Sequence, residues 1–177
     1  MRRILAAVLI VLAALGMPGS ALAQTEIDIT GGRVDPLPIA IAPFLAGGGA
    51  EESAATISAV VTNDLGRSGY FAPLDPATFI EKIASFDQTP DFASWKQIQA
   101  KALVTGQTFN DGGKMRVEFR LWDVNTGQQL AAQQFTTSPK NDRRIGHMIA
   151  DIIYKQMTGI DGYFDTRIVF VTEEGPK

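Results

Sequence analysis

The chain has 177 residues and a formal net charge of −3, from 16 basic and 19 acidic side chains, with one histidine and no cysteine. An acidic balance argues against general nucleic-acid binding, which depends on neutralising phosphates with Lys and Arg. Without cysteine there are no disulfides and no thiolate metal ligands, so an apolar core alone must hold the fold.

The first 23 residues are typical of a signal peptide. Arg2 and Arg3 form a basic start, and the run Ile4–Leu15 is continuously apolar. A helix of this run would be about 18 Å long, too short for about 30 Å of hydrocarbon. The Ala-Leu-Ala triplet ending at Ala23 predicts cleavage there and export of the chain. Removing this leader takes the charge from −3 to −5, and no cysteine follows to carry a lipid anchor.

Residues 24–35 form a short alternating segment ahead of the main body. Ile27 and Ile29 would lie on one side of an extended strand, with acidic residues on the other. Gly31–Gly32 would then act as a hinge. The pattern leaves two interpretations open. One is an ordinary first strand at the edge of the domain's own sheet, and the other is a mobile arm that adds as a strand to a partner's sheet. Both hold if the segment leaves its own domain to bind.

A strand followed by helices is predicted next. Residues 38–44 read as a buried strand, and a helix follows a glycine loop, with apolar residues at helical spacing up to Leu65. A short extended piece comes after it. Asp75–Pro76 and Thr89–Pro90 each combine a capping position with a proline suited to a first helical turn. They predict two further helices before residue 101.

The last third predicts an antiparallel meander and a helix. Three extended segments over residues 102–135 are separated by turn residues, and the middle one alternates strictly between apolar and charged side chains from Met115 to Leu121. Residues 141–159 have the apolar spacing of a helix that ends at Gly159. The elements together predict an α/β (α+β) fold, in which helices cover one face of a sheet and the other face is polar.

The catalytic, metal and cofactor candidates are weak. His147 lies off the apolar stripe of its helix, which is typical of a surface or capping residue, and no G-x-S-x-G motif is present. No His and Asp/Glu cluster has metal-ligand spacing. The Gly47–Gly49 loop lacks the Gly-Lys-Ser/Thr ending of a P-loop. We therefore predict no catalytic residue, cofactor or metal; an exported enzyme or small-ligand binder with a site near Gly47–Gly49 remains the alternative.

Five segments carry a family pattern, in order, over most of residues 36–172. They are PIAIAPF (38–44), VVTNDLGRSGYFAPLD (60–75), PDFASWKQIQAKALVTGQ (90–107), VEFRLWDVNTGQQL (117–130) and RRIGHMIADIIYKQMTGIDGYFDTRIVFV (143–171). Behind a signal peptide, this series resembles the amino-terminal portion of the TolB family, the periplasmic components of the Tol–Pal system of Gram-negative bacteria. The resemblance implies a mixed five-stranded sheet with helices packed on it, over residues 36–163.

The resemblance also implies a non-catalytic interaction module in the periplasm. In the family, the mature amino terminus binds the C-terminal domain of TolA, and the module supports outer-membrane integrity, outer-membrane invagination in cell division and protein import. Carried over, Ile27 and Ile29 become the anchors of this contact, and His147 and Asp151 match a helix pattern that we interpret as structural. The implied partner-binding residues are Gln24, Thr25, Glu26, Ile27, Asp28, Ile29, Thr30 and Asp35.

The family continues into a six-bladed β-propeller that binds the lipoprotein Pal. Here residues 164–177 resemble only the opening strand of the first blade, so the chain is expected to be truncated at that point. Pal binding is therefore expected only where a propeller is present. Neither nucleic-acid binding nor stable membrane insertion after removal of the signal peptide is expected.

Overall fold

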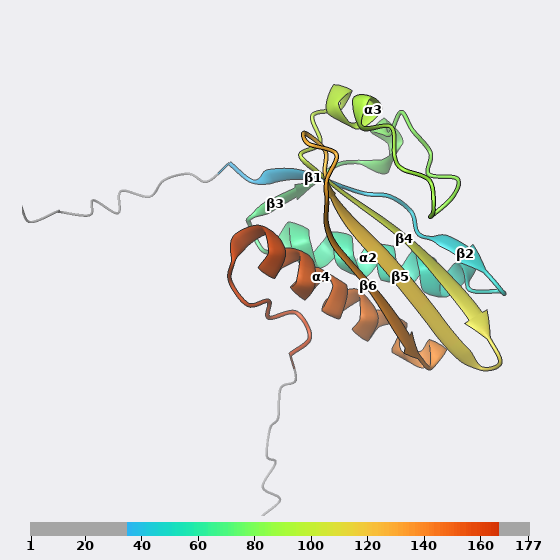
Figure 1. Ribbon diagram of the computed structural model, residues 1–177. Coiled ribbons are helices and arrows are strands. Elements are labelled where there is room, and N and C mark those ends of the chain that lie inside the picture. The colour runs from blue at the N-terminus through green and yellow to red at the C-terminus, as the bar shows by residue number, and fades with distance from the viewer. Residues whose placement is uncertain (1–34, 167–177) are drawn as a thin grey trace, which may run out of the picture. The chain divides into compact units, whose positions relative to one another are not determined.

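A computed structural model describes residues 35–166 as a mixed sheet with helices packed on it (Figure 1). The strand order is β3-β1-β4-β5-β6, and β2 also pairs with β4. The elements are β1 (Leu37–Ile41), β2 (Leu45–Gly47), α2 (Glu51–Arg67), β3 (Phe71–Pro73), the 3-10 turn η1 (Pro76–Thr78), α3 (Phe92–Gln97), β4 (Ala102–Asp111), β5 (Lys114–Asp123), β6 (Gln129–Thr137), the 3-10 turn η2 (Pro139–Asn141) and α4 (Asp142–Thr158).

The α+β class and the mixed sheet are confirmed, with six strands where five were expected. The additional strand is β2, whose three residues pair with β4 beyond the point where β1 ends. β1 runs parallel to both β3 and β4, while β4, β5 and β6 form the antiparallel meander. A parallel neighbour requires a crossover connection, and α2 supplies it between β1 and β3.

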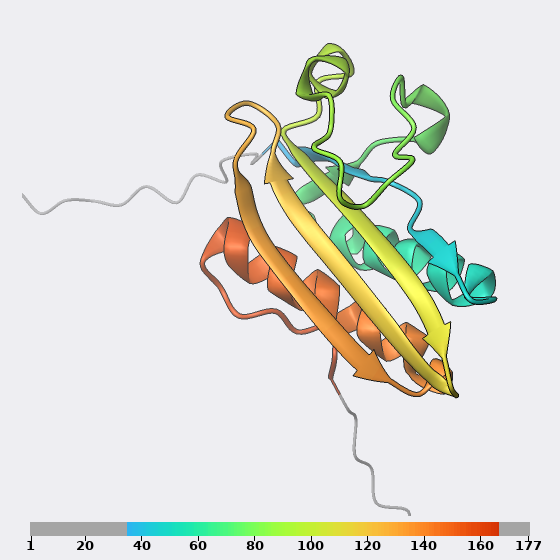
Figure 2. The same cartoon turned by 45° about the vertical axis from the view of Figure 1, so that its right-hand side comes forward.

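Two apolar cores lie on opposite faces of the sheet. The larger core lies between the sheet and the helices α2 and α4. In the smaller core, Trp95 of α3 packs with Leu103 and Trp122, and Figure 2 shows the segment with η1 and α3 on the face away from the long helices. The polar face predicted from the sequence is therefore restricted to the part of the sheet that carries Arg116 and Glu118.

The meander forms as its alternation predicts. Met115, Val117, Phe119 and Leu121 are all fully buried in the larger core. The β4–β5 turn consists of Gly112 and Gly113, with φ of 54° and 81°, values that glycine adopts without the strain that a Cβ atom brings. At the β5–β6 turn, the Asp123 carboxylate accepts hydrogen bonds from the backbone N–H groups of Asn125 and Thr126.

The prediction of a helix after Asp75–Pro76 is wrong. Asp75 caps only the short turn η1, and the chain is irregular from there to α3. In this segment the Glu81 carboxylate accepts hydrogen bonds from the backbone N–H of Asp91 and from Trp95 Nε1. These contacts, across ten and fourteen residues, connect the irregular segment to the start of α3. The next helix does form, but Asp91 is its cap, two residues after the predicted start.

The two long helices lie side by side on one face of the sheet in both views (Figures 1 and 2). They approach closely at Gly146 of α4, where a Cβ atom would lie 2.7 Å from Val60 of α2. α4 ends as predicted at Gly159, whose φ of 75° is a left-handed conformation that closes a helix.

Gly146→Ala is expected to lower the free energy of unfolding by about 1–3 kcal/mol, because the added methyl group would overlap Val60. This loss should exceed the gain in helix propensity, which is about 1 kcal/mol. Gly66→Ala in α2 is the matched control, since its Cβ would meet Pro73 at an ordinary 3.4 Å, and it should be neutral or stabilising. Urea midpoints, compared at a constant m-value, measure the stability of both variants. A Gly146→Ala variant as stable as the parent chain would contradict the packing argument.

Candidate functional site

The root of the predicted arm lies at an exposed position. Asp35 and Pro36 are exposed ahead of β1, and the backbone N–H of Leu37 donates to the carbonyl oxygen of Tyr70 at 2.8 Å. Residues 24–34 lie outside the described part of the chain, so Asp35 alone of the predicted partner-binding residues can be placed. The arm therefore stays a prediction, attached where β1 lies beside β3.

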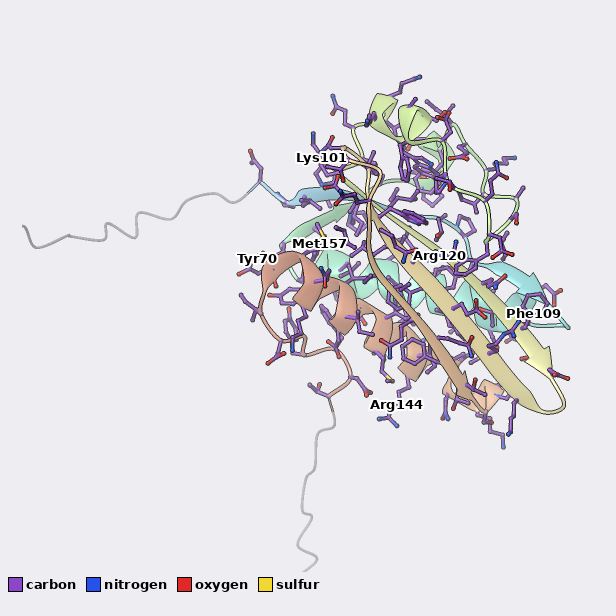
Figure 3. The ribbon with its side chains drawn as sticks, in the orientation of Figure 1. Tyr70, Lys101, Phe109, Arg120, Arg144 and Met157 are labelled. Atoms are coloured by element: carbon purple, nitrogen blue, oxygen red, sulfur yellow. The ribbon has the colours of Figure 1, made fainter. Side chains whose placement is uncertain are left out.

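An aromatic cluster lies near this root. The chain's three tyrosines, Tyr70, Tyr154 and Tyr163, meet edge-to-face, with ring centroids 5.4 and 5.7 Å from that of Tyr154. Tyr154 is buried. Desolvation is the main reason that the pKa of its hydroxyl is raised, and the two neighbouring tyrosines raise it further. Tyr70 and Tyr163 remain about half exposed, and Figure 3 shows Tyr70 at the opposite end of the domain from Phe109. No local sequence signal indicated this cluster, because its members are far apart in the chain.

His147 was predicted to be a surface or capping residue, but its ring contacts a buried carboxylate on the other long helix. Its Nδ1 lies 2.5 Å from one carboxylate oxygen of Asp64, and Nη2 of Arg67 donates to the other oxygen at 2.5 Å. The Asp64 side chain is only 2% exposed. A buried carboxylate is costly unless it is paired and hydrogen-bonded, so these contacts join α4 to α2. An available sequence signal was the position of Asp64 on the buried face of α2, next to Leu65.

Asp151 holds the chain that follows α4. Its two carboxylate oxygens accept hydrogen bonds from the backbone N–H groups of Phe164 and Asp165, at 2.8 and 3.0 Å. Gly162 permits this approach, because a Cβ atom there would overlap the Asp151 side chain. Arg144 adds an ion pair to Asp165 at 3.2 Å. The structural interpretation of Asp151 therefore has a specific basis, since Asp151 holds a segment that runs back along α4.

A single exposed ion pair also lies at this end of the domain. Lys155 donates to Asp161 at 2.6 Å, which lowers the pKa of the Asp161 carboxyl and raises the pKa of the Lys155 ammonium group. The Asp161 side chain is 84% exposed. Exposed pairs of this kind contribute little to stability, so Asp151 rather than this pair anchors the segment.

The Gly47–Gly49 loop has a packing explanation. A Cβ atom at Gly47 would overlap the ring of Phe109, and one at Gly48 would overlap the carbonyl oxygen of Asn110. Asn110 Nδ2 also donates to the Gly49 carbonyl at 3.1 Å. These contacts bring β2 and the β4–β5 hairpin together, so no bound ligand is needed to account for the glycines.

A hollow of about 470 Å³ does lie beside this loop. Its charged lining residues are Asp111, Lys114 and Arg116. The guanidinium of Arg116 lies over the ring of Phe109 and pairs with Glu118, which is on the same strand. Within residues 35–166, no group of three or more acidic or histidine side chains is placed to hold a metal ion, and no helix is long and apolar enough to cross a membrane.

Comparison with known proteins decides the family. A family model described as the TolB amino-terminal domain matches residues 25–130, more than half of the chain. The chain belongs to the TolB amino-terminal domain family. This confirms the resemblance carried by the five sequence segments. The TolB family comprises non-enzymatic, periplasmic components of the Tol–Pal system.

A solved TolB structure agrees with this assignment. TolB from Acinetobacter baumannii is 29% identical over 73% of this chain, with a TM-score of 0.63. The match covers 30% of that TolB chain, so the present chain spans less than a third of the relative's length.

More distant structural matches add nothing to the functional assignment. Lipoprotein GNA1162 from Neisseria meningitidis is 16% identical, with a TM-score of 0.48, over 71% of this chain and 99% of its own. The LpoB C-terminal domain from Salmonella enterica is 11% identical, with a TM-score of 0.46, over 62% of this chain and 87% of its own.

Asp151→Ala is expected to release the segment after α4. The backbone N–H groups of Phe164 and Asp165 would lose their acceptors, so their hydrogen-exchange rates should rise by about tenfold or more. The control is Asp161→Ala, which removes only the exposed contact with Lys155 and should leave both rates unchanged. Equal protection in the Asp151→Ala variant would show that other contacts hold the segment.

Proposed function

We propose that this chain is an interaction module of the Tol–Pal system that binds the C-terminal domain of TolA through residues 24–35. Through this contact it supports outer-membrane integrity, outer-membrane invagination in cell division and protein import. The supporting observation is that the family match begins at residue 25 and so includes nearly all of the proposed arm. The arm would add as a strand to a sheet of TolA, with main-chain hydrogen bonds providing affinity.

The geometry of the arm's root suits this role. Asp35 and Pro36 are exposed, whereas Leu37 already belongs to the domain through its bond to Tyr70. Residues before Asp35 can therefore pair with another protein without breaking any strand pairing of the described sheet. Ile27 and Ile29 would be the anchors, since alternate apolar side chains give an added strand its fit.

The proposed domain organisation follows the same family relationship. Residues 1–23 are a signal peptide cleaved after Ala23, which delivers the chain to the periplasm, residues 24–35 are the arm, and residues 36–163 are the α+β domain. Residues 164–177 open the first blade of a β-propeller, and Pal would bind only to a protein that carries that propeller. The proposal involves no catalysis, cofactor or nucleic acid.

Removal of the arm is the direct test. A chain that starts at Gln24 should capture the TolA C-terminal domain in a pull-down, whereas a chain that starts at Pro36 should not. Both chains should share one thermal midpoint, because the truncation leaves β1 and its partners intact. Undiminished capture by the shorter chain would place the TolA contact elsewhere and end the proposal.

Point substitutions in the arm test the role of the two isoleucines. Ile27→Asp and Ile29→Asp should each weaken the TolA interaction by about 30-fold or more, the effect expected for a buried interface anchor. Glu26→Gln is the comparison within the arm, because its side chain points to the other side of an extended strand, and it should weaken the interaction less than either isoleucine variant. Titration calorimetry measures all three; equal losses in the three variants would contradict the assigned anchors.

A further inference from the structure

A hollow of about 400 Å³ lies between the two long helices. Its walls are one side of α2 and the first half of α4, and its lining residues are Thr56, Ala59, Val60, Asn63, Asp64, Arg67, Arg143 and His147. Ala59, Asn63, Arg67 and Arg143 are exposed, so the groove opens to solvent. Neither the arm nor the hollow at the glycine loop includes any of these residues.

The charge of the groove is opposite in sign to that of the chain. Asp64 is its only acidic lining residue, and both of its carboxylate oxygens are already occupied by His147 and Arg67. The neighbouring acid, Asp142, lies outside the lining and accepts a hydrogen bond from the backbone N–H of Arg143. The groove is therefore cationic on a chain whose formal net charge is −3.

The two arginines retain most of their hydrogen-bonding capacity. Arg67 uses only Nη2 for Asp64, and its side chain is 73% exposed. Arg143 makes no ion pair within residues 35–166. A guanidinium group has five N–H donors in a planar fork that matches a carboxylate. Donors from two helices thus face one groove, and both oxygens of its only acidic lining residue already have partners.

We propose that this groove binds an acidic, extended segment of a partner protein, with a partner carboxylate held between Arg67 and Arg143. The lining of α2 from Thr56 to Arg67 is about 16 Å long at 1.5 Å per residue, which matches about five residues of extended peptide at 3.3 Å each. A small anion would use only a fraction of this length. Asn63, whose side chain makes no hydrogen bond within the described residues, adds an amide to the same wall.

Hexaglutamate is the probe, with hexaglutamine as the uncharged control. It is titrated into the chain starting at Gln24, labelled with ¹⁵N, and backbone amide shifts are followed. Saturable shifts should centre on Asn63, Arg67 and Arg143, and hexaglutamine should cause none. Raising the salt from about 50 to 500 mM should weaken binding, because exposed charges are then screened over a few ångströms.

Arg143→Gln is the decisive variant, since Arg143 supports no ion pair that its loss would break within the described residues. It should weaken hexaglutamate binding by about tenfold, the loss expected for one charge-assisted hydrogen-bonding group. Lys101→Gln removes the same charge from an exposed site that is not part of the groove lining, and should change affinity by less than about twofold. Unchanged hydrogen exchange in α4 of both variants confirms that they remain folded.

Three results would overturn the proposal: no saturable shift at the groove, equal weakening by Arg143→Gln and Lys101→Gln, or equal binding of hexaglutamine. A fourth result would show that the groove is occupied by a segment of the chain itself. If replacing Glu173 and Glu174 with Gln strengthens hexaglutamate binding by about tenfold, the chain's own acidic residues compete for the groove and the partner assignment is wrong. The chain that starts at Pro36 should bind hexaglutamate normally, which separates this outcome from that of the TolA experiment.

Discussion

Strand β4 is the element on which the rest of the domain depends. It pairs in parallel with β1 and then with β2 on one side, and antiparallel with β5 along its full length on the other. Every other strand therefore reaches the sheet through β4, either directly or through one neighbour. Burial of β4 residues in both cores joins the crossover half of the domain to the meander. The cationic groove and the root of the arm are placed by helices and strands that this one strand aligns.

Elements defined by local patterns could be predicted from the sequence. The meander was predictable because alternation in β5 and a pair of glycines after Asp111 specify strands and turn together. The long helices were predictable because their apolar spacing extends over several turns. The region after Asp75 was not, because Glu81 binds residues ten and fourteen positions away. A capping signal describes only the first turn of a helix and cannot reveal such distant contacts.

The candidate sites also divide into those with a local sequence pattern and those formed by residues far apart in the chain. The proposed arm and its two isoleucines could be predicted from the sequence, because strand alternation is local. The pairing of Asp64 with His147 joins residues 83 positions apart, so the sequence offered only an acid on the buried face of α2. The tyrosine cluster and the groove had no local signal at all. They arise because α2 and α4 lie side by side, which is a property of the packed sheet.

The contact between Asp151 and the returning segment affects how the domain bears mechanical load. The chain doubles back after Gly159 and is held at Phe164 and Asp165, next to the middle of α4. Tension applied beyond residue 166 would first reach these two hydrogen bonds and the Arg144 ion pair. The pull would be shared with the body of the helix before its last turn could unwind. A single carboxylate thereby protects the end of α4 from being peeled away from the sheet.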